Sequence, residues 1–185
     1  MSNVGFDFST IDFSTIDFST IDFSKVDVDK WLSLRPMLNV KKIPSGTFQM
    51  GCTSGDSDCA GDESQVHTVE ISRAFYLMES EVTQGLYESV MGSNPSHFKG
   101  SSLPVETVSW FDAVEFANKL SVKEGLEQCY SISGDNVSWS NKDCNGWRLP
   151  TEAEWEYASR GNQSYKYAGS SDLSSVAWYD GWIKE

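Results

Sequence analysis

Four cysteines are the residues of this sequence with the clearest potential for chemistry, and their spacing divides them into two local pairs. Cys52 and Cys59 flank the polar segment TSGDSD, and Cys129 and Cys144 flank YSISGDNVSWSNKD, which has the pattern of strand, turn and strand. A hairpin brings opposed Cβ atoms to about 4.5–5.5 Å, within reach of a disulfide. Two disulfides and an oxidising compartment are favoured over four free thiols in a cytosolic protein. The spacing has no CxxC, so a zinc site is not indicated.

Three glutamates, Glu152, Glu154 and Glu156, form the second group of candidates, in the stretch GWRLPTEAEWEYASRG at residues 146–161. Glu152 and Glu156 are four residues apart, so a helix places them on one face. Two carboxylates across a cleft are what a glycosidase uses as acid and base. A solvated or ion-paired helix face is the commoner role of such a pair, and carboxylates near a helix N-terminus also stabilise the helix dipole.

The same stretch carries the signals that begin and end a helix. Pro150 keeps the preceding chain extended, and Thr151 is the expected N-cap. Glu154, three residues later, completes a capping box with it. Gly161 lies where a left-handed C-cap belongs. The sequence therefore predicts a short, well-specified helix between Thr151 and Gly161.

Arg148 and Trp155 complete this structural motif. Arg148 directly precedes the helix and can reach back to a carboxylate, so we expect it to form internal salt bridges with the glutamates. Trp155 and Ala158 are three residues apart, which predicts that one side of the helix is buried. We assign the chain no catalytic, cofactor-binding or metal-binding residue.

The other candidates for chemistry are isolated side chains. His67 lies in a predicted strand and His97 in a turn, and without a third ligand each is interpreted as structural. Ser109 is in VSWFD rather than in the GxSxG elbow of a hydrolase. The aromatic segment VAWYDGW, residues 176–182, could stack a sugar or another ligand, but a place in the core is favoured.

Two further helices and several strands must position these residues. Thr83 can cap a helix over TQGLYESVMG that stops at Gly92, and Ser109 with Asp112 can cap a second one that stops at Gly125. The expected buried face of the second helix consists of Trp110, Val114, Ala117 and Leu120. Alternation predicts strands at residues 47–50 and from residue 67 onward, where the pattern fits one long strand or two short ones.

The bulk composition limits the classes of function. The chain has 185 residues, 14 Lys or Arg against 27 Asp or Glu, and a net charge of −13. This charge argues against binding to nucleic acid or to an anionic membrane, because either needs a basic patch. No apolar run is long enough to span a bilayer, and MSNVGFDFST lacks the basic and apolar regions of a signal peptide.

Residues 1–38 are expected to form a leader and a linker, separate from a domain over residues 39–185. Residues 6–25 repeat the unit IDFST, with too few copies for a stacked solenoid. We interpret them as a low-complexity segment extended by tandem duplication. A weaker alternative is that their alternating Phe, Ile and Asp residues add an edge strand to a partner.

Five motifs, in order, resemble the formylglycine-generating enzyme family, also called the sulfatase-modifying factor domain: IPSGTFQMG, DESQVHTVEI, EVTQGLYESVMGSNPSHF, LPVETVSWFDAVEFANKLS and GWRLPTEAEWEYASRG. The resemblance covers about residues 40–179. It implies an α+β, C-type-lectin-like fold with short strands, about three helices and much irregular chain. It also implies that active members oxidise a substrate cysteine to formylglycine with O2 and copper held by two cysteines. Related members are iron-dependent sulfoxide synthases, and others are non-catalytic recognition modules.

The sequence departs from the catalytic pattern of that family. It lacks the RGGSW-type and GN.WEW-type segments near the catalytic cysteines, the histidine cluster of the iron enzymes and the calcium-binding stretches. Gln65 stands where the family usually has proline, and Cys129 with Cys144 fits a subgroup that braces its hairpin. We therefore expect the N-terminal part of such a domain, truncated at its C-terminus, with no copper or calcium of its own.

The favoured hypothesis is a non-catalytic binding or structural module whose partner is a protein or a glycan. The alternative is part of an active formylglycine-generating oxidase whose catalytic cysteines come from a missing C-terminal half. A periplasmic, secreted or cell-surface location follows if the disulfides form. A cytoplasmic location stays open because no signal peptide is seen in this sequence.

Overall fold

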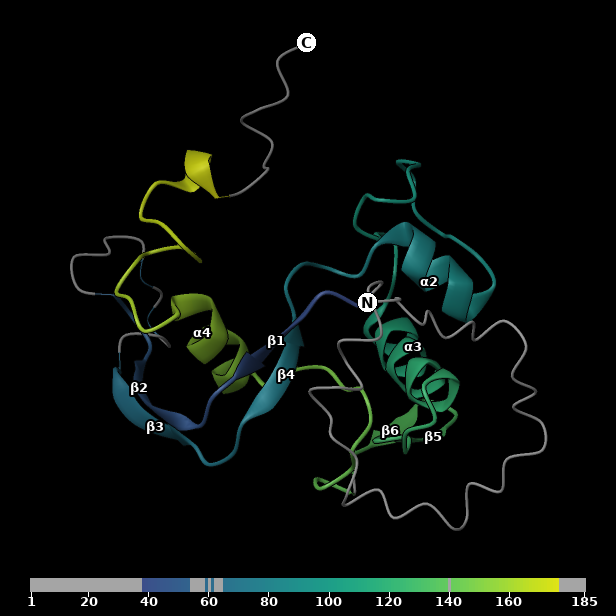
Figure 1. Ribbon diagram of the computed structural model, residues 1–185, viewed down its shortest axis with the longest axis horizontal. Helices are drawn as coiled ribbons and strands as arrows, with labels where there is room; N and C mark the ends of the chain where they lie inside the picture. Colours follow the sequence, from purple (N-terminus) through teal and green to yellow (C-terminus); the bar gives the residue numbers. More distant parts are fainter. Residues whose placement is uncertain (1–37, 54–58, 60, 62–64, 140, 177–185) are drawn as a thin grey trace, which may run out of the picture. The chain divides into compact units, whose positions relative to one another are not determined.

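The computed structural model describes residues 38–53, 59, 61, 65–139 and 141–176 (Figure 1). The leader with its IDFST repeats and most of the segment VAWYDGW lie outside the described residues. Within them, three α-helices and short antiparallel strands are separated by long irregular segments, an α+β architecture as the sequence predicts. No helix in the described ranges has the length and apolarity needed to cross a membrane.

Four strands form two nested antiparallel pairs. β1 (Val40–Ile43) pairs with β4 (Phe75–Met78), and β2 (Gly46–Met50) pairs with β3 (His67–Ile71) inside them. The apolar run that begins at residue 67 is therefore two short strands rather than one long one. The break between β1 and β2 falls at Pro44, whose missing N–H would interrupt a ladder.

The first two helices begin and end at the predicted caps. α2 (Gln84–Met91) starts at Thr83, whose side chain accepts a hydrogen bond from a backbone N–H of the first turn, and ends at Gly92 in the left-handed region. α3 (Trp110–Lys123) starts with a capping box between Ser109 and Asp112. Gly125 follows its C-terminus with φ of 72°. Local side-chain chemistry alone was thus sufficient to set these boundaries.

The segment between Cys129 and Cys144 contains the predicted hairpin. β5 (Ser131–Ser133) pairs with β6 (Asn136–Ser138), and Gly134 in the turn has φ of 59°, a conformation that favours glycine. The remaining regular elements are α4 (Glu152–Arg160) and a short 3-10 helix, η5 (Leu173–Ser175).

α3 lies between two hydrophobic clusters. In the first, Tyr87 of α2 stacks on Phe116 of α3 with ring centroids 5.3 Å apart. In the second, Val114 and Ala117 pack against residues that border the hairpin. Trp147 packs against both clusters and so joins them. Much of the core is therefore built from irregular chain laid against one helix.

One member of the predicted buried face of α3 is placed differently. Val114, Ala117 and Leu120 are buried as expected, but Trp110 is 52% exposed. Trp110 is the first residue of the helix, so it extends past the region where the second cluster covers α3. Its indole instead lies in T-shaped contact with Phe111 and borders an open hollow.

A buried glutamine fixes the irregular chain after α2. Gln84 is 1% exposed, and its side-chain nitrogen donates to the carbonyl oxygens of Phe98 and Pro104 at 2.7 and 3.1 Å. Its side-chain oxygen accepts from the Asn94 amide at 2.9 Å and from the Gly100 N–H at 3.0 Å. All four hydrogen-bonding positions of one side chain are thus used to hold a loop that has no regular structure of its own.

Candidate functional site

Arg148 reaches back to α4, as the sequence predicts, and its partner is Glu154. The two terminal nitrogens of the guanidinium each donate to one carboxylate oxygen at 2.6 Å. Glu154 also accepts from the backbone N–H of Thr151, which completes the predicted capping box. Partial burial alone would raise the pKa of Glu154, but the hydrogen bonds from Arg148 and Thr151 and the arginine charge lower it below its usual value.

Glu156 belongs to a separate network at the other end of α4. Its Oε1 accepts from the Nε of Arg160 at 2.8 Å and from the backbone N–H of Gly51 at 2.9 Å, and a terminal nitrogen of Arg160 lies 2.6 Å away in an ion pair. Arg160 also donates to the Gly51 carbonyl oxygen. Glu152 is exposed at the start of the helix. The three glutamates therefore have different surroundings, and the geometry does not form a glycosidase pair from Glu152 and Glu156.

The prediction that Trp155 is buried is wrong, because its side chain is 58% exposed. The helix packs on the strands through its other side, where Tyr157 contacts Phe48 of β2 with ring centroids 5.3 Å apart. Glu156 and Arg160, which contact Gly51 at the end of β2, are on the same side of the helix as these strands. Gly161 ends the helix in the left-handed region with φ of 53°, as predicted.

The isolated candidates are not assembled into a catalytic group. His67 is exposed and bonds to the carbonyl of Gln65 at 3.0 Å, and His97 lies against Phe98 in an edge-on contact. The Ser109 hydroxyl donates to Asp112 within the capping box of α3. In the described ranges, no three His, Cys, Asp or Glu side chains are close enough together to hold a metal ion.

The four cysteines form the two predicted disulfides. Cys52 is joined to Cys59 and Cys129 to Cys144, with Cα atoms 5.7 and 5.4 Å apart respectively. Cys129 is 2% exposed and belongs to the second hydrophobic cluster, so that bond joins the base of the hairpin to the core of the domain. No cysteine of the chain is a free thiol in this structure.

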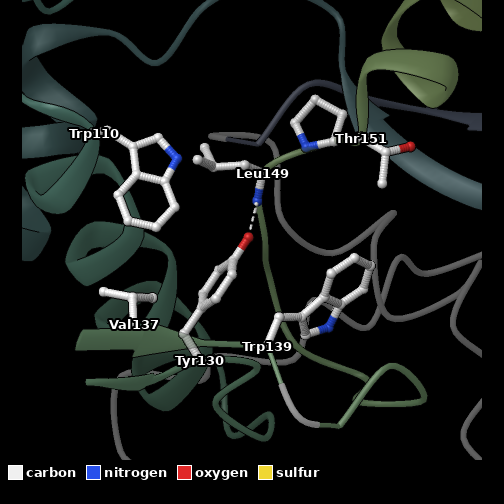
Figure 2. A pocket seen from close by; sticks show the side chains of 7 residues that line it. Trp110, Tyr130, Val137, Trp139, Leu149 and Thr151 are labelled. Carbon is white, nitrogen blue, oxygen red and sulfur yellow. Dashed lines mark hydrogen bonds between the residues drawn. The ribbon is translucent and has the colours of Figure 1, made fainter. Parts of the chain in front are cut away.

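The described surface has an open hollow of about 360 Å³ beside the hairpin. Its lining comprises Trp110, Tyr130, Val137, Trp139 and the segment Leu149–Thr151. Figure 2 shows the Tyr130 phenol between the two indoles, with its hydroxyl directed at the backbone of Leu149. The hollow is therefore formed by the start of α3, the strand β6 with the residue after it, and the extended chain before α4.

Hydrogen bonds and ring contacts fix the lining of this hollow. The Tyr130 hydroxyl oxygen accepts from the Leu149 N–H at 3.0 Å, and the Trp139 indole donates to the Asn141 carbonyl oxygen at 3.0 Å. The guanidinium of Arg148 lies 4.7 Å from the centre of the Trp139 ring. Arg148 thus supports one wall of the hollow while its charge is paired with Glu154.

Comparison with known proteins agrees with the resemblance found in the motifs. The model of the sulfatase-modifying factor enzyme 1-like domain matches residues 34–185. The chain belongs to this family. A solved relative, variable protein 1 of Treponema denticola, superposes with a TM-score of 0.63 at 35% identity, covering 76% of this chain and 60% of that one. The sulfatase-modifying factor fold is thereby shown for the described domain.

Two sequence relatives match this sulfatase-modifying factor-like chain over part of their own length. The chaperone protein LppX of Paenibacillus barcinonensis is 45% identical over 57% of this chain and 44% of its own length. The formylglycine-generating enzyme of Streptomyces coelicolor is 28% identical over 72% of this chain and 51% of its own length. The chain thus spans about half the length of these relatives.

The family resemblance implies that active members bind copper. This copper is held by two cysteine thiolates. In this sulfatase-modifying factor-like chain, each cysteine forms a disulfide with another cysteine nearby in the sequence. The two partners are 7 residues apart in one disulfide and 15 residues apart in the other. A disulfide sulfur cannot act as a thiolate ligand without prior reduction. The cysteines present therefore do not fit that metal in the oxidised state described here.

The aromatic side chains of the hollow were not predicted to come together, and Pro150 and Thr151 were singled out only for the start of α4. Trp110 was assigned to the core, and Trp139 and Tyr130 were treated only as part of a hairpin between two cysteines. Tyr130, Trp139 and Leu149 come together because the disulfide and Trp147 hold the hairpin and the chain before α4 on the same side of α3. The one available signal was the number of aromatic residues near Cys129 and Cys144.

Proposed function

We propose that this sulfatase-modifying factor-like domain is a non-catalytic binding or structural module, and that its cysteines brace the fold rather than hold copper. The observation that carries the proposal is the pairing of all four cysteines in two local disulfides. One of these bonds includes the buried Cys129, so its reduction would disturb the core rather than free a surface ligand. The proposal extends to the absence of a resident copper or calcium ion in this chain.

Two observations support a binding role in particular. The aromatic hollow has a volume within the range of about 300–1,000 Å³ that is typical of ligand sites, and its lining is mainly apolar. A relative at 45% identity bears the name of a chaperone, a class of protein that acts by binding others. A protein or a glycan is accordingly the proposed partner, in a periplasmic, secreted or cell-surface location where disulfides persist.

The test is a copper-binding and oxygen-consumption assay on the purified, oxidised chain. A cysteine-containing peptide of the sulfatase type serves as substrate, and mass spectrometry detects formylglycine. We expect no tight Cu(I) binding, no oxygen uptake above the peptide-only control and no change in peptide mass. Turnover of the peptide by the oxidised chain would contradict the proposal. The Cys52→Ser/Cys59→Ser variant is the control that shows whether any signal arises from this cysteine pair.

A second candidate function is supported by the match to a formylglycine-generating enzyme. In this alternative, the chain is part of an oxidase whose copper-binding cysteines lie outside these 185 residues, since the match covers only 51% of that enzyme. Reading the coding sequence beyond residue 185 distinguishes the two functions. A downstream cysteine pair, together with peptide oxidation by the extended protein, would favour the oxidase and leave the present domain as its scaffold.

A further inference from the structure

The hollow beside the hairpin has walls suited to a flat, partly apolar ring. Trp110 is half exposed and presents its indole to the hollow, while Trp139 forms another part of the wall, already contacted by Arg148 (Figure 2). Tyr130 lies between them. Aromatic surfaces of this kind remove a large apolar area from water when a ring packs against them. Trp110 is therefore the surface available for stacking a ligand.

The electrostatics of the lining indicate a ligand without charge. None of the residues that line the hollow is an aspartate, glutamate, lysine, arginine or histidine. Arg148 lies against Trp139, but both of its terminal nitrogens are bonded to Glu154. Lys142 is exposed, outside the lining, with its ammonium 5.7 Å from the centre of the Trp139 ring. An anionic ligand would thus find no unpaired cation in the lining itself.

Hydrogen-bond donors remain available at the hollow. The Tyr130 side chain is 9% exposed, and its oxygen accepts from the Leu149 N–H, but a phenol also has a hydrogen to donate. Within the described part of the chain, that hydrogen has no acceptor, and the Trp110 indole N–H also lacks one. These two donors are thus available to a ligand oxygen that takes the place of water in the open hollow.

We propose that this hollow binds a neutral pyranose, with an apolar face of the sugar ring against Trp110 and a sugar hydroxyl accepting a hydrogen bond from Tyr130. The proposal rests on the proposed function as a binding module and names the ligand class of its site. A pyranose combines apolar C–H faces with uncharged hydroxyls, which matches an aromatic wall, unused donors and an uncharged lining. A proline-rich peptide would need a row of pockets, whereas these residues surround a single hollow.

The test uses the oxidised chain and ligand-observed NMR with four probes: the methyl glycosides of glucose, galactose, mannose and N-acetylglucosamine. A decaproline peptide is measured alongside them. We expect saturable binding of at least one glycoside, detected also as a change in tryptophan fluorescence. The Trp110→Ala variant should bind it about tenfold more weakly, because the stacking surface is lost.

The matched control is Trp155→Ala, which removes another half-exposed tryptophan that does not line the hollow, and its affinity should equal that of the original chain. Trp110→Leu keeps apolar bulk at the start of α3, so it serves if the alanine variant fails to fold by circular dichroism. Tyr130→Phe should weaken binding severalfold. Binding of none of the glycosides, binding unaffected by both Trp110 variants, or saturable binding of decaproline alone would overturn the proposal. A negative copper assay together with any of these results would leave the non-catalytic function standing.

Discussion

The side-chain amide of Asn118 forms hydrogen bonds with both the N–H and the carbonyl oxygen of Tyr130. The Asn118 nitrogen donates to the Tyr130 carbonyl oxygen at 2.8 Å, and its oxygen accepts from the Tyr130 N–H at 3.1 Å. Asn118 is 5% exposed in the middle of α3. The Asn118 amide therefore takes the place of a paired β-strand for the backbone of Tyr130. It holds this lining residue of the hollow against α3.

Replacing Asn118 with alanine should destabilise the domain by about 3 kcal/mol. The change leaves the N–H and the carbonyl oxygen of Tyr130 buried without partners, and each unsatisfied group costs about 1–3 kcal/mol. Urea unfolding followed by circular dichroism measures the free energy of unfolding. Asn39→Ala, at an exposed asparagine, is the matched control and should change stability little. Equal stability of the two variants would show that the Asn118 contacts contribute little.

Gly146 is expected to tolerate no side chain. A Cβ atom at this position would overlap the carbonyl oxygen of Glu127 and lie 2.7 Å from the Ser121 hydroxyl. The Ser121 hydroxyl has little room to move, because Ser121 is fully buried and its hydroxyl accepts from the Trp147 N–H at 2.8 Å. Gly146→Ala should therefore destabilise the domain by roughly 3 kcal/mol.

The control for Gly146 is Gly61→Ala, because a Cβ at Gly61 meets nothing within 4 Å. Thermal melts of the two variants, monitored in parallel, should show a lowered midpoint only for Gly146→Ala. A normal melt of that variant would mean that Glu127 and its neighbours move aside at little energetic cost.

The two disulfides should differ in their contribution to stability. In the chain-entropy model, loops of this length give roughly 2.5 kcal/mol for Cys52–Cys59 and 3 kcal/mol for Cys129–Cys144. Replacing Cys129 also leaves a gap in the second hydrophobic cluster, so its double alanine variant should be the less stable one. Urea unfolding of both double variants gives the comparison.

Peptide mapping without reduction tests the pairing itself. We expect one cross-linked pair of peptides that contains Cys52 and Cys59, and a second that contains Cys129 and Cys144. Recovery of four alkylated cysteines from folded, unreduced protein would contradict both bonds and remove the main support for a non-catalytic module.

Local chemistry made part of this structure predictable. The three helices were placed from their caps, because a side chain such as Thr151 or Ser109 bonds within its own helix and needs no other segment. The five sequence motifs also indicated the family that the domain comparison shows. The hairpin between Cys129 and Cys144 followed from the alternating pattern and the turn residues within it.

Contacts between distant segments were not predictable in the same way. Trp155 has the spacing of a buried residue, but the buried face of the helix includes Glu156 and Arg160, which contact Gly51 at separations of 105 and 109 residues in the sequence. Gln84 is polar and looks like a surface residue, yet it is buried because the loop after α2 wraps around it. The hollow depends on contacts of this kind, so its lining could be assigned only from the three-dimensional structure.

The ion pair of Arg148 with Glu154 should make stability depend on pH below neutrality. The pKa of Glu154 is lowered in the folded domain, since the bonds from Arg148 and Thr151 outweigh the effect of burial. A carboxyl whose folded pKa is depressed contributes its stability above the unfolded value of about 4.3. This contribution is lost as the pH falls through the folded pKa.

Glu154→Gln isolates this contribution, because glutamine keeps the size of the side chain but does not titrate. The variant should be less stable by about 1–2 kcal/mol at neutral pH, where the charged hydrogen bonds are lost, and the difference from the original chain should shrink on acidification. Asp112 and Glu106 also have lowered pKa values, through hydrogen bonds from Ser109 and from Thr107 respectively. Both chains contain these two carboxyls, so they cancel in the comparison. Urea midpoints at about pH 7 and about pH 3 measure the difference, and equal differences at both values would show that folding does not lower the pKa of Glu154.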